Sequence, residues 1–209
     1  MSRRNRAILI SMMALMFGGC ASMNEQECLV TDWRTVGFED GALGRSPESI
    51  ARYRQACSKH GVAPNLEAYR SGHAEGVETF CQPVKGFNYG RSGAIYHGVC
   101  PADLEYGFLA AYNEGRELHG LESAVRSADS LIAQRHRALD NIKKQIVDNE
   151  AAIITEGTSA ADRVTLLAET KELSRQIGVI EAEIVELERD RAVHAQALLD
   201  YRNTLAYEF

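Results

Sequence analysis

Residues 118–153 read LHGLESAVRSADSLIAQRHRALDNIKKQIVDNEAAI, with an apolar side chain at nearly every seventh position along two offset rows. The same period returns after a short break and runs to the end of the chain. A sustained apolar spacing of 3.5 residues is typical of helices that pack as a left-handed coiled coil. The predicted seam residues are Leu118, Val125, Ile132, Leu139, Ile146 and Ile153 with Leu121, Ala128, Arg135, Ile142 and Asn149, then Leu166, Leu173, Ile180, Leu187, His194 and Tyr201 with Ile177, Ile184, Arg191, Leu198 and Leu205.

The break between the two repeats has the residues of a helix end followed by a helix start. Gly157 can end the first helix, because glycine readily adopts the left-handed conformation found there. Ser159 followed by Asp162 resembles a helix cap. A connection of about five residues favours antiparallel neighbours. We therefore predict an antiparallel coiled-coil hairpin over residues 118–209, with its turn near 155–159.

The first half of the chain has a different character, because fifteen of the seventeen glycines lie within residues 1–120. Helix-start residues and glycine stops predict helices over about 31–43, 47–59 and 65–81, and a further helix from Pro101 into the coiled coil. The segment Gly86–Gly93 is expected to form an ordered loop or a short hairpin. The predicted fold is mainly α, with a small helical domain over residues 28–117 before the hairpin.

A weak repeat of aromatic residues and glycines runs through these helices. Trp33 precedes Gly37 and Gly41, Tyr69 precedes Gly72 and Gly76, and Tyr112 precedes Gly115. Each glycine in a helix interior costs about 1 kcal/mol relative to alanine. The spacing of four makes a flat surface, so we expect tight helix packing beneath an aromatic lid.

Four cysteines lie in the small domain: Cys28, Cys57, Cys81 and Cys100. An even number in an exported chain indicates two disulfides, for which three pairings exist. If the helices near 31–43 and 47–59 form a hairpin, Cys28 lies beside Cys57, and Cys81 is left with Cys100. No CxxC or HxxxH spacing supports the alternative of a metal site, so no metal is expected.

The N-terminus has the organisation of an export signal. Three arginines (residues 3, 4 and 6) precede an apolar stretch over residues 7–17, which is shorter than the roughly 20 residues needed to cross a bilayer. Phe17-Gly18-Gly19-Cys20 resembles the lipobox of bacterial lipoproteins. The resemblance implies a signal peptide over residues 1–19, acylation of Cys20, and a short lipidated tether over residues 20–27. Because Ala follows Cys20, it also implies the outer membrane, with the chain facing the periplasm.

The charge of the chain argues against one class of partner. The whole sequence has 23 basic and 29 acidic residues, and removal of the signal peptide takes away three arginines, which leaves a net charge of −9. No basic patch is available for phosphates, so nucleic acid is not an expected partner. The expected partners are the membrane, through the lipid anchor, and an envelope protein or a second copy, through the coiled coil.

No catalytic motif is recognisable, so no catalytic residue and no cofactor beyond the covalent lipid are assigned. The polar candidates in the first half are His60, His73, Glu75, His97, Asp103 and Glu105. A glycan- or peptidoglycan-binding module is an alternative, because a glycine-rich loop with aromatic faces and an arginine suits sugars and carboxylates. Its candidate residues are Phe87, Tyr89, Arg91, Tyr96 and His97. The simpler interpretation is that both tyrosines pack the loop onto the helices and Arg91 is solvated. A hydrolase with an unrecognised site is the second alternative.

One further resemblance covers about residues 28–120. The run Tyr69-x-x-Gly72-x-x-x-Gly76, Phe80-Cys81, Gly86-Phe87, Gly90-Arg91-Ser92-Gly93-Ala94, Tyr96 and Cys100-Pro101 is similar to an uncharacterised family of Gram-negative envelope lipoproteins. The resemblance implies an envelope location and brings no activity. The leading hypothesis is a lipid-anchored structural or interaction protein that is not an enzyme.

Overall fold

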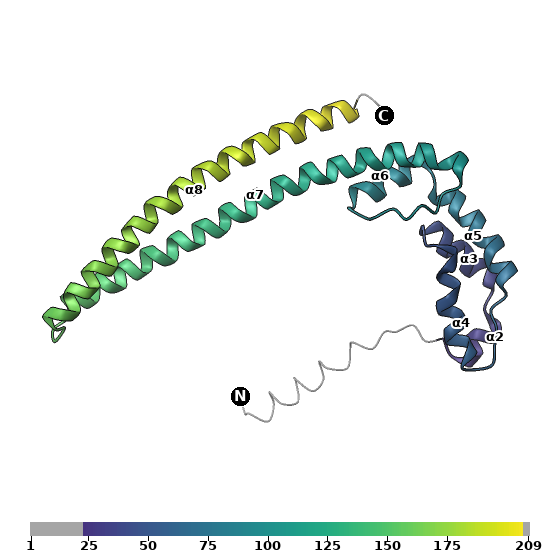
Figure 1. Ribbon diagram of the computed structural model, residues 1–209, viewed down its shortest axis with the longest axis horizontal. Helices are drawn as coiled ribbons and strands as arrows, with labels where there is room; N and C mark the ends of the chain where they lie inside the picture. The colour runs from purple at the N-terminus through teal and green to yellow at the C-terminus, as the bar shows by residue number, and fades with distance from the viewer. Residues whose placement is uncertain (1–22, 207–209) are drawn as a thin grey trace. The chain divides into compact units, whose positions relative to one another are not determined.

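The computed structural model describes residues 23–206, in which seven α-helices and one short 3-10 helix are found and no strand (Figure 1). The prediction of a mainly α fold is confirmed. Cys20 and the predicted signal peptide lie outside the described residues. Contacts divide the chain into two compact units: the residues up to Lys85 together with Tyr96–Phe108, and Gly86–Ile95 together with the residues from Leu109 onward.

The first unit begins with short helices whose ends are fixed by side-chain caps. Helix α2 (Glu25–Val30) starts with a capping box between Asn24 and Glu27, and α3 (Trp33–Ala42) is capped by Asp32. Ser46 caps the 3-10 helix η1 (Pro47–Ser49), which leads into α4 (Ile50–Ser58). Helix α5 (Leu66–Phe80) is capped by Asn65. The predicted helices over 31–43, 47–59 and 65–81 are confirmed, whereas α2 was not predicted.

Helices α3 and α5 are in backbone contact and run parallel to each other. A Cβ atom on Gly37 would collide with the carbonyl oxygen of Tyr69, and one on Gly41 would collide with that of His73. Both contacts advance by four residues in the same direction, so the two helices point the same way. Gly72 and Gly76 meet the carbonyls of α3 in return. The expected tight packing on glycines is confirmed.

An aromatic layer covers one side of this helix pair. Trp33 meets Tyr53 of α4 edge-on at 5.9 Å between ring centroids, and Tyr53 meets Tyr69 at 6.3 Å. Trp33 and Tyr69 are buried in the same cluster as Cys28 and Cys57. The disulfide between these two cysteines therefore closes the core at the end where α3 and α5 begin.

The segment expected to be a loop or short hairpin is instead a helix, α6 (Pro83–Arg91). The prediction was wrong because two glycines lower the local helix propensity, and the sequence alone does not show the helix against which they pack. Gly90 lies against the carbonyl oxygen of Tyr112 on helix α7 (Ala102–Ile154), and Gly115 lies against that of Phe87. Tertiary packing on the bare backbone thus outweighs the local cost of the glycines.

The α6–α7 pair repeats several contacts of the α3–α5 pair. Gly90 meets Tyr112 as Gly41 meets His73, and both pairs of helices run parallel. Residues of α3 correspond to residues of α6 that lie 49 positions later in the sequence. Residues of α5 correspond to residues of α7 that lie 39 positions later. The weak sequence repeat therefore reflects an internal structural duplication.

The chain leaves the first helix of each pair in the same way. Gly44 and Gly93 both have a positive φ, 68° and 78°, and each lies directly against a ring of the second helix. Just beyond these turns, Nε2 of His73 lies 2.8 Å from the carbonyl oxygen of Arg45. The Tyr112 hydroxyl donates to the carbonyl oxygen of Ala94 at 2.9 Å. A buried side chain of the second helix thus fixes the exit of the first helix in both copies.

Both predicted disulfides are present. Cys28 is bonded to Cys57 and Cys81 is bonded to Cys100, with Cα atoms 5.7 and 5.6 Å apart. Each bond links the segment before the first helix of a pair to the segment before its second helix. The pairing was predicted from a hairpin of neighbouring helices, whereas the glycine-packed partner of α3 is α5, which follows α4 in the chain.

The antiparallel hairpin is confirmed as α7 and α8 (Ala160–Ala206), which lie side by side beyond a turn at residues 155–159 (Figure 1). Gly157 has a φ of 92°. The Ser159 hydroxyl accepts from the backbone N–H of Asp162 at 3.1 Å, as the capping pattern predicts. Helix α7 begins directly after Pro101 and continues without interruption into the hairpin, as expected.

The predicted seam faces the inside of the hairpin. Leu118, Ala128, Leu139, Ile142 and Ile184 are buried, and the other seam positions are half-buried except for Arg191. Arg191 lies outside the apolar contact and donates to Asp129 across the hairpin at 2.8 Å. Within residues 23–206, no helix combines the length and the apolar character that crossing a bilayer requires.

Candidate functional site

The proposed binding-loop residues of the second unit all have internal roles. The carbonyl of Phe87 lies against Gly115, and the ring of Tyr89 lies 6.3 Å from that of Tyr112. The hydroxyl of Tyr89 is 3.4 Å from the carbonyl oxygen of Ile95. These contacts hold α6 against α7 and agree with the interpretation that the aromatic residues are used for packing.

Arg91 is not simply solvated, because its guanidinium lies 3.5 Å from the carboxylate of Glu122. Arg202 of α8 donates to the same carboxylate at 2.7 Å, and Arg126 approaches it to 3.7 Å. The hydrogen bond from Arg202 and the charges of the other two arginines lower the pKa of Glu122. Glu122 thus joins α6, α7 and the C-terminal part of α8.

Tyr96 and His97 belong to the first unit. The ring of Tyr96 packs on that of Phe108 at 4.9 Å, and its hydroxyl accepts from the backbone N–H of Cys100 and donates to Glu105 at 3.0 Å. Burial raises the pKa of Tyr96, which keeps the hydroxyl protonated as a donor. His97 is exposed. Tyr96 therefore packs on the helix start of α7, as the simpler interpretation expected.

A buried carboxylate, Asp40, is the centre of the most polar cluster in the first unit, and it was missed in the sequence. Its Oδ1 accepts from Arg45 and Arg52, both at 2.7 Å. Its Oδ2 accepts from the hydroxyl of Tyr69 at 2.8 Å, while Tyr53 approaches Oδ1 at 3.3 Å. The available signal was an aspartate between packing glycines, followed by two arginines.

The electrostatics of this cluster favour a structural role. Burial by itself would raise the pKa of Asp40, but hydrogen bonds from Arg45 and Tyr69 and the charge of Arg52 outweigh it, and the pKa is lowered. Burial, followed by the bond to Asp40, raises the pKa of Tyr69. A carboxylate with this many donors is a poor proton acceptor, so Asp40 fixes α3 to α4 and α5 rather than activating a substrate.

His73 is the other buried polar residue in the described chain, and it lines a hollow of about 340 Å³. Nε2 is bonded to the carbonyl of Arg45, and the ring stacks on Tyr69 at 6.0 Å. The rest of the hollow is largely apolar: Pro47, Ala74, Val77, Val99, Cys100 and Pro101, together with Glu78. No Ser, Thr, Lys or free Cys lines the hollow as a nucleophile, and no group of three or more metal-ligating side chains occurs in residues 23–206.

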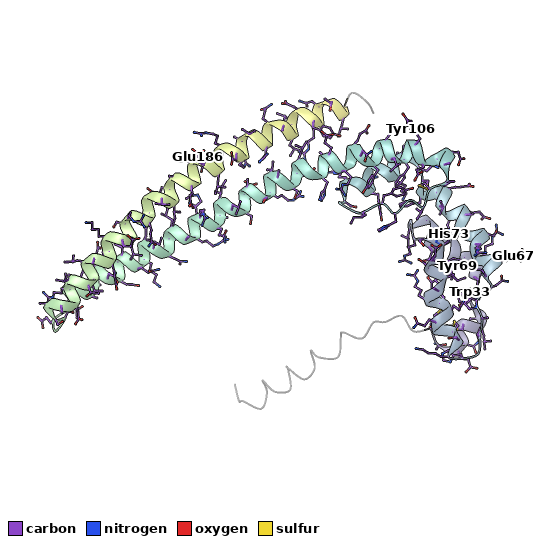
Figure 2. All side chains as sticks on the ribbon, viewed as in Figure 1. Trp33, Glu67, Tyr69, His73, Tyr106 and Glu186 are labelled. Carbon is purple, nitrogen blue, oxygen red and sulfur yellow. A yellow bond between two sulfur atoms is a disulfide. The ribbon has the colours of Figure 1, made fainter. Side chains whose placement is uncertain are left out.

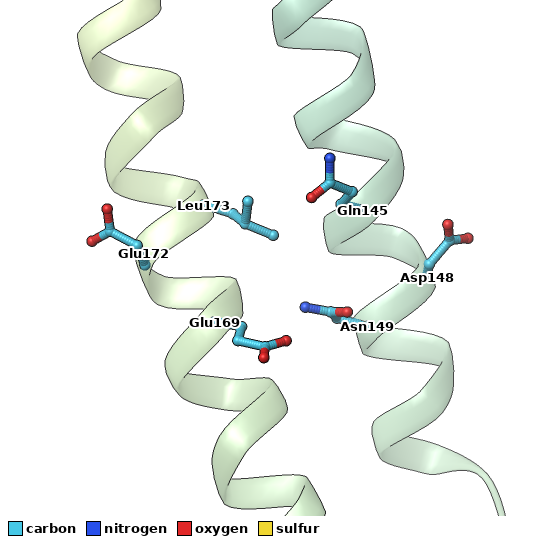
Figure 3. Close-up of a pocket in the computed structure, with 6 residues that line it drawn as sticks. All are labelled: Gln145, Asp148, Asn149, Glu169, Glu172 and Leu173. Carbon is cyan, nitrogen blue, oxygen red and sulfur yellow. The ribbon is translucent and has the colours of Figure 1, made fainter.

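A cavity of about 440 Å³ opens where the hairpin seam becomes polar near Asn149 (Figure 3). Leu173 and Gln145 point into the gap between α7 and α8, whereas Glu172 points away from it. Glu172 is exposed, and hydrogen bonds from Arg175 and then Gln176 lower its pKa to about 2. This gap is an opening in the seam and carries no arrangement of reactive groups.

The outer face of α8 carries a second apolar row, separate from the seam. Ile184 is 7% exposed in the seam, whereas the next residue, Val185, is 56% exposed on the outside. The members of this outer stripe lie in two neighbouring lengthwise rows, Val179 with Val193 and Val185 with Leu199, and the two members of each row are fourteen residues apart. Small residues Gly178, Ala182 and Ala192 lie among them on the same side of the helix.

Acidic side chains surround the outer stripe. Residues 178–200 contain six acidic residues and only two basic ones, Arg189 and Arg191. Arg189 is paired with Glu186 on the same helix, and Arg191 is paired with Asp129 on α7. Glu186 is labelled on the outside of the hairpin in Figure 2. The stripe is therefore an apolar surface with an acidic border.

Comparison with known proteins gives one family. Residues 32–117 match a family described as a protein of unknown function (DUF2799). Neither a curated protein nor a solved structure matches the chain. The matched segment begins at the cap of α3 and includes both glycine-packed helix pairs, as the sequence resemblance over residues 28–120 indicated. The hairpin beyond residue 117 lies outside the match.

Proposed function

We propose that this protein is a lipid-anchored scaffold or adaptor of the bacterial envelope, and that the outer stripe of α8 binds a partner. The outer stripe is the observation that carries the proposal. Val185 and Val193, 56% and 62% exposed, lie one position from the seam residues Ile184 and His194. The hairpin uses its seam for its own packing, so the second apolar row is left for another chain.

The charge of this surface selects the kind of partner. A helix with an apolar row and basic flanks matches the acidic border of the outer stripe. A second copy of this chain is disfavoured, because two outer stripes in contact would bring their acidic borders together. The proposed partner is therefore a basic amphipathic helix of another envelope protein, and self-association is an outcome that the test below can reveal.

Crosslinking in living cells tests this surface. A photoreactive benzophenone residue is placed at position 185 or 193 of the full-length chain, with a matched control at position 144, where exposed Lys144 lies on the outer face of α7. We expect the same heteromeric adduct from positions 185 and 193 and none from 144. Mass spectrometry should map the adduct to a basic helix. A homodimer adduct, or equal adducts from all three positions, contradicts the proposal.

The anchor is supported by the lipobox resemblance at Cys20, and its expected location is the outer membrane, facing the periplasm. Several acyl chains give a durable membrane attachment. Mass spectrometry of the N-terminal peptide should find acylated Cys20, and Cys20→Ala should release the protein from washed outer membranes. An N-terminus that starts at any other residue contradicts the anchor.

No structural observation favours the glycan-binding or hydrolase hypotheses. Arg91 is paired with Glu122, and Tyr89 and Tyr96 pack against helix α7. The test is binding of the wild-type protein and of the Arg91→Ala, Tyr96→Ala variant to purified peptidoglycan. Binding that is lost in the variant would show a glycan-binding activity in addition to the proposed scaffold role. The expected result is no binding by the wild-type chain.

A further inference from the structure

The disulfide between Cys28 and Cys57 lies close to the beginning of the described chain. The sulfur of Met23 is 4.0 Å from that of Cys57, and Met23 packs against the core cluster around this disulfide. Cys20 is only three residues before Met23. An extended chain spans at most about 3.6 Å per residue, so Cys20 is held within about 11 Å of Met23.

This end of the first unit exposes two adjacent apolar side chains. Leu29 and Val30 directly follow Cys28 at the end of α2, and they are 61% and 69% exposed. Cys28 is buried, so the last turn of α2 places one residue in the core and leaves the next two exposed to solvent. These two side chains are only a few residues from the proposed lipid attachment point. The apolar interior of the bilayer is therefore close enough to bury them.

The charged groups near this end are mostly acidic. Glu25 and Glu27 lie on α2, and Glu27 is engaged in the capping box. Lys59 and His60, both exposed, follow Cys57 across the disulfide. With Glu25, Glu27 and Asp32 against Lys59, the surface has no charge attraction to anionic lipid. Any attraction to a membrane must come from the apolar pair.

We propose that Leu29 and Val30 insert into the interface of the membrane, so that the disulfide-closed end of the first unit rests on lipid. This inference depends on the proposed acylation of Cys20. The acyl chains supply attachment, and the apolar pair supplies a second contact that restricts how the first unit turns about its tether.

Quenching by brominated phospholipids measures this contact directly. The full-length acylated protein is reconstituted into phosphatidylethanolamine vesicles with a minor fraction of phosphatidylglycerol, with and without brominated acyl chains. Leu29→Trp reports on the proposed contact, while Trp33, the single natural tryptophan, is buried and gives the background. Leu43→Trp is the matched control, since Leu43 is exposed at the opposite end of α3, about 15 Å away along the helix.

The expected result is strong quenching at position 29, none at position 43, and no increase in quenching at low salt or at a larger phosphatidylglycerol fraction. Adding Val30→Asp should abolish the quenching while the protein stays on the vesicles. Equal emission from position 29 in both kinds of vesicle, with acylation verified by mass spectrometry, overturns the lipid contact and leaves the anchor intact. Absence of acylation overturns the anchor itself, so the two failures are distinguishable.

Discussion

The carbonyl oxygen of Phe38 occupies the space that a Cβ atom on Gly76 would need. The same relation holds between Phe87 and Gly115 in the second helix pair. Contact at this distance allows Cα–H···O interactions along two parallel helices, and a side chain of any size prevents it. The same backbone contact is therefore used twice, once in each helix pair.

Replacement of a packing glycine should destabilise the protein, although alanine is the better helix former. Gly76→Ala is expected to lower the free energy of unfolding by about 3 kcal/mol, because the neighbour that must move is backbone. Gly120→Ala is the matched control, since nothing lies within 4 Å of its added Cβ atom. It should raise stability by about 0.5–1 kcal/mol. Denaturant unfolding measures both, and equal effects would refute the packing role.

The Asp40 cluster should contribute stability that depends on pH. Its folded-state pKa is lowered from 3.8, so the contribution is fully present above that value and is lost as the pH falls through the folded pKa. Asp40→Asn leaves Arg45 and Arg52 without their charge partner, and a loss of about 2 kcal/mol is expected at pH 7. The difference between wild type and Asp40→Asn should shrink in acid. A constant difference down to pH 2 would show that the charge is not the cause.

The two disulfides, both within the first unit, should stabilise it by similar amounts. Removing either bond as a pair of Cys→Ser changes is expected to cost about 2–4 kcal/mol. The bonds close loops of 29 and 19 residues, which predicts a slightly larger loss, by about 0.4 kcal/mol, for Cys28–Cys57. Chemical denaturation of the two double variants checks this. Thiol titration of the unfolded wild type should find no free cysteine among these four.

The same substitution at two neighbouring residues of α8 should change the free energy of unfolding by very different amounts. Ile184→Asp places a charge in the seam and should cost about 3–5 kcal/mol. Val185→Asp changes an exposed side chain and should alter the free energy of unfolding by less than about 0.5 kcal/mol. Thermal unfolding followed by circular dichroism separates them. Similar losses for both would mean that the outer stripe belongs to the internal packing.

The sequence was sufficient to predict the hairpin because its information is local: a seven-residue apolar period and a Gly157 turn specify both arms. The disulfides followed from four cysteines in one small domain. Helix α6 was missed because Gly86 and Gly90 weaken a local helix signal, and the contacts of Gly90 and Phe87 with α7 compensate. Asp40 was missed for a related reason. Its burial depends on Arg45, Arg52 and Tyr69, which the fold brings together from separate segments.

The most direct test of the account measures whether the outer stripe binds a partner without supporting the fold. The yield of the partner adduct from a photoreactive residue at position 193 is compared in cells that carry the wild-type chain or Val185→Asp, at equal amounts of membrane-bound protein. The account predicts that the adduct falls to background in Val185→Asp while the unfolding temperature is unchanged. An undiminished adduct would contradict the assignment of the outer stripe as the binding surface.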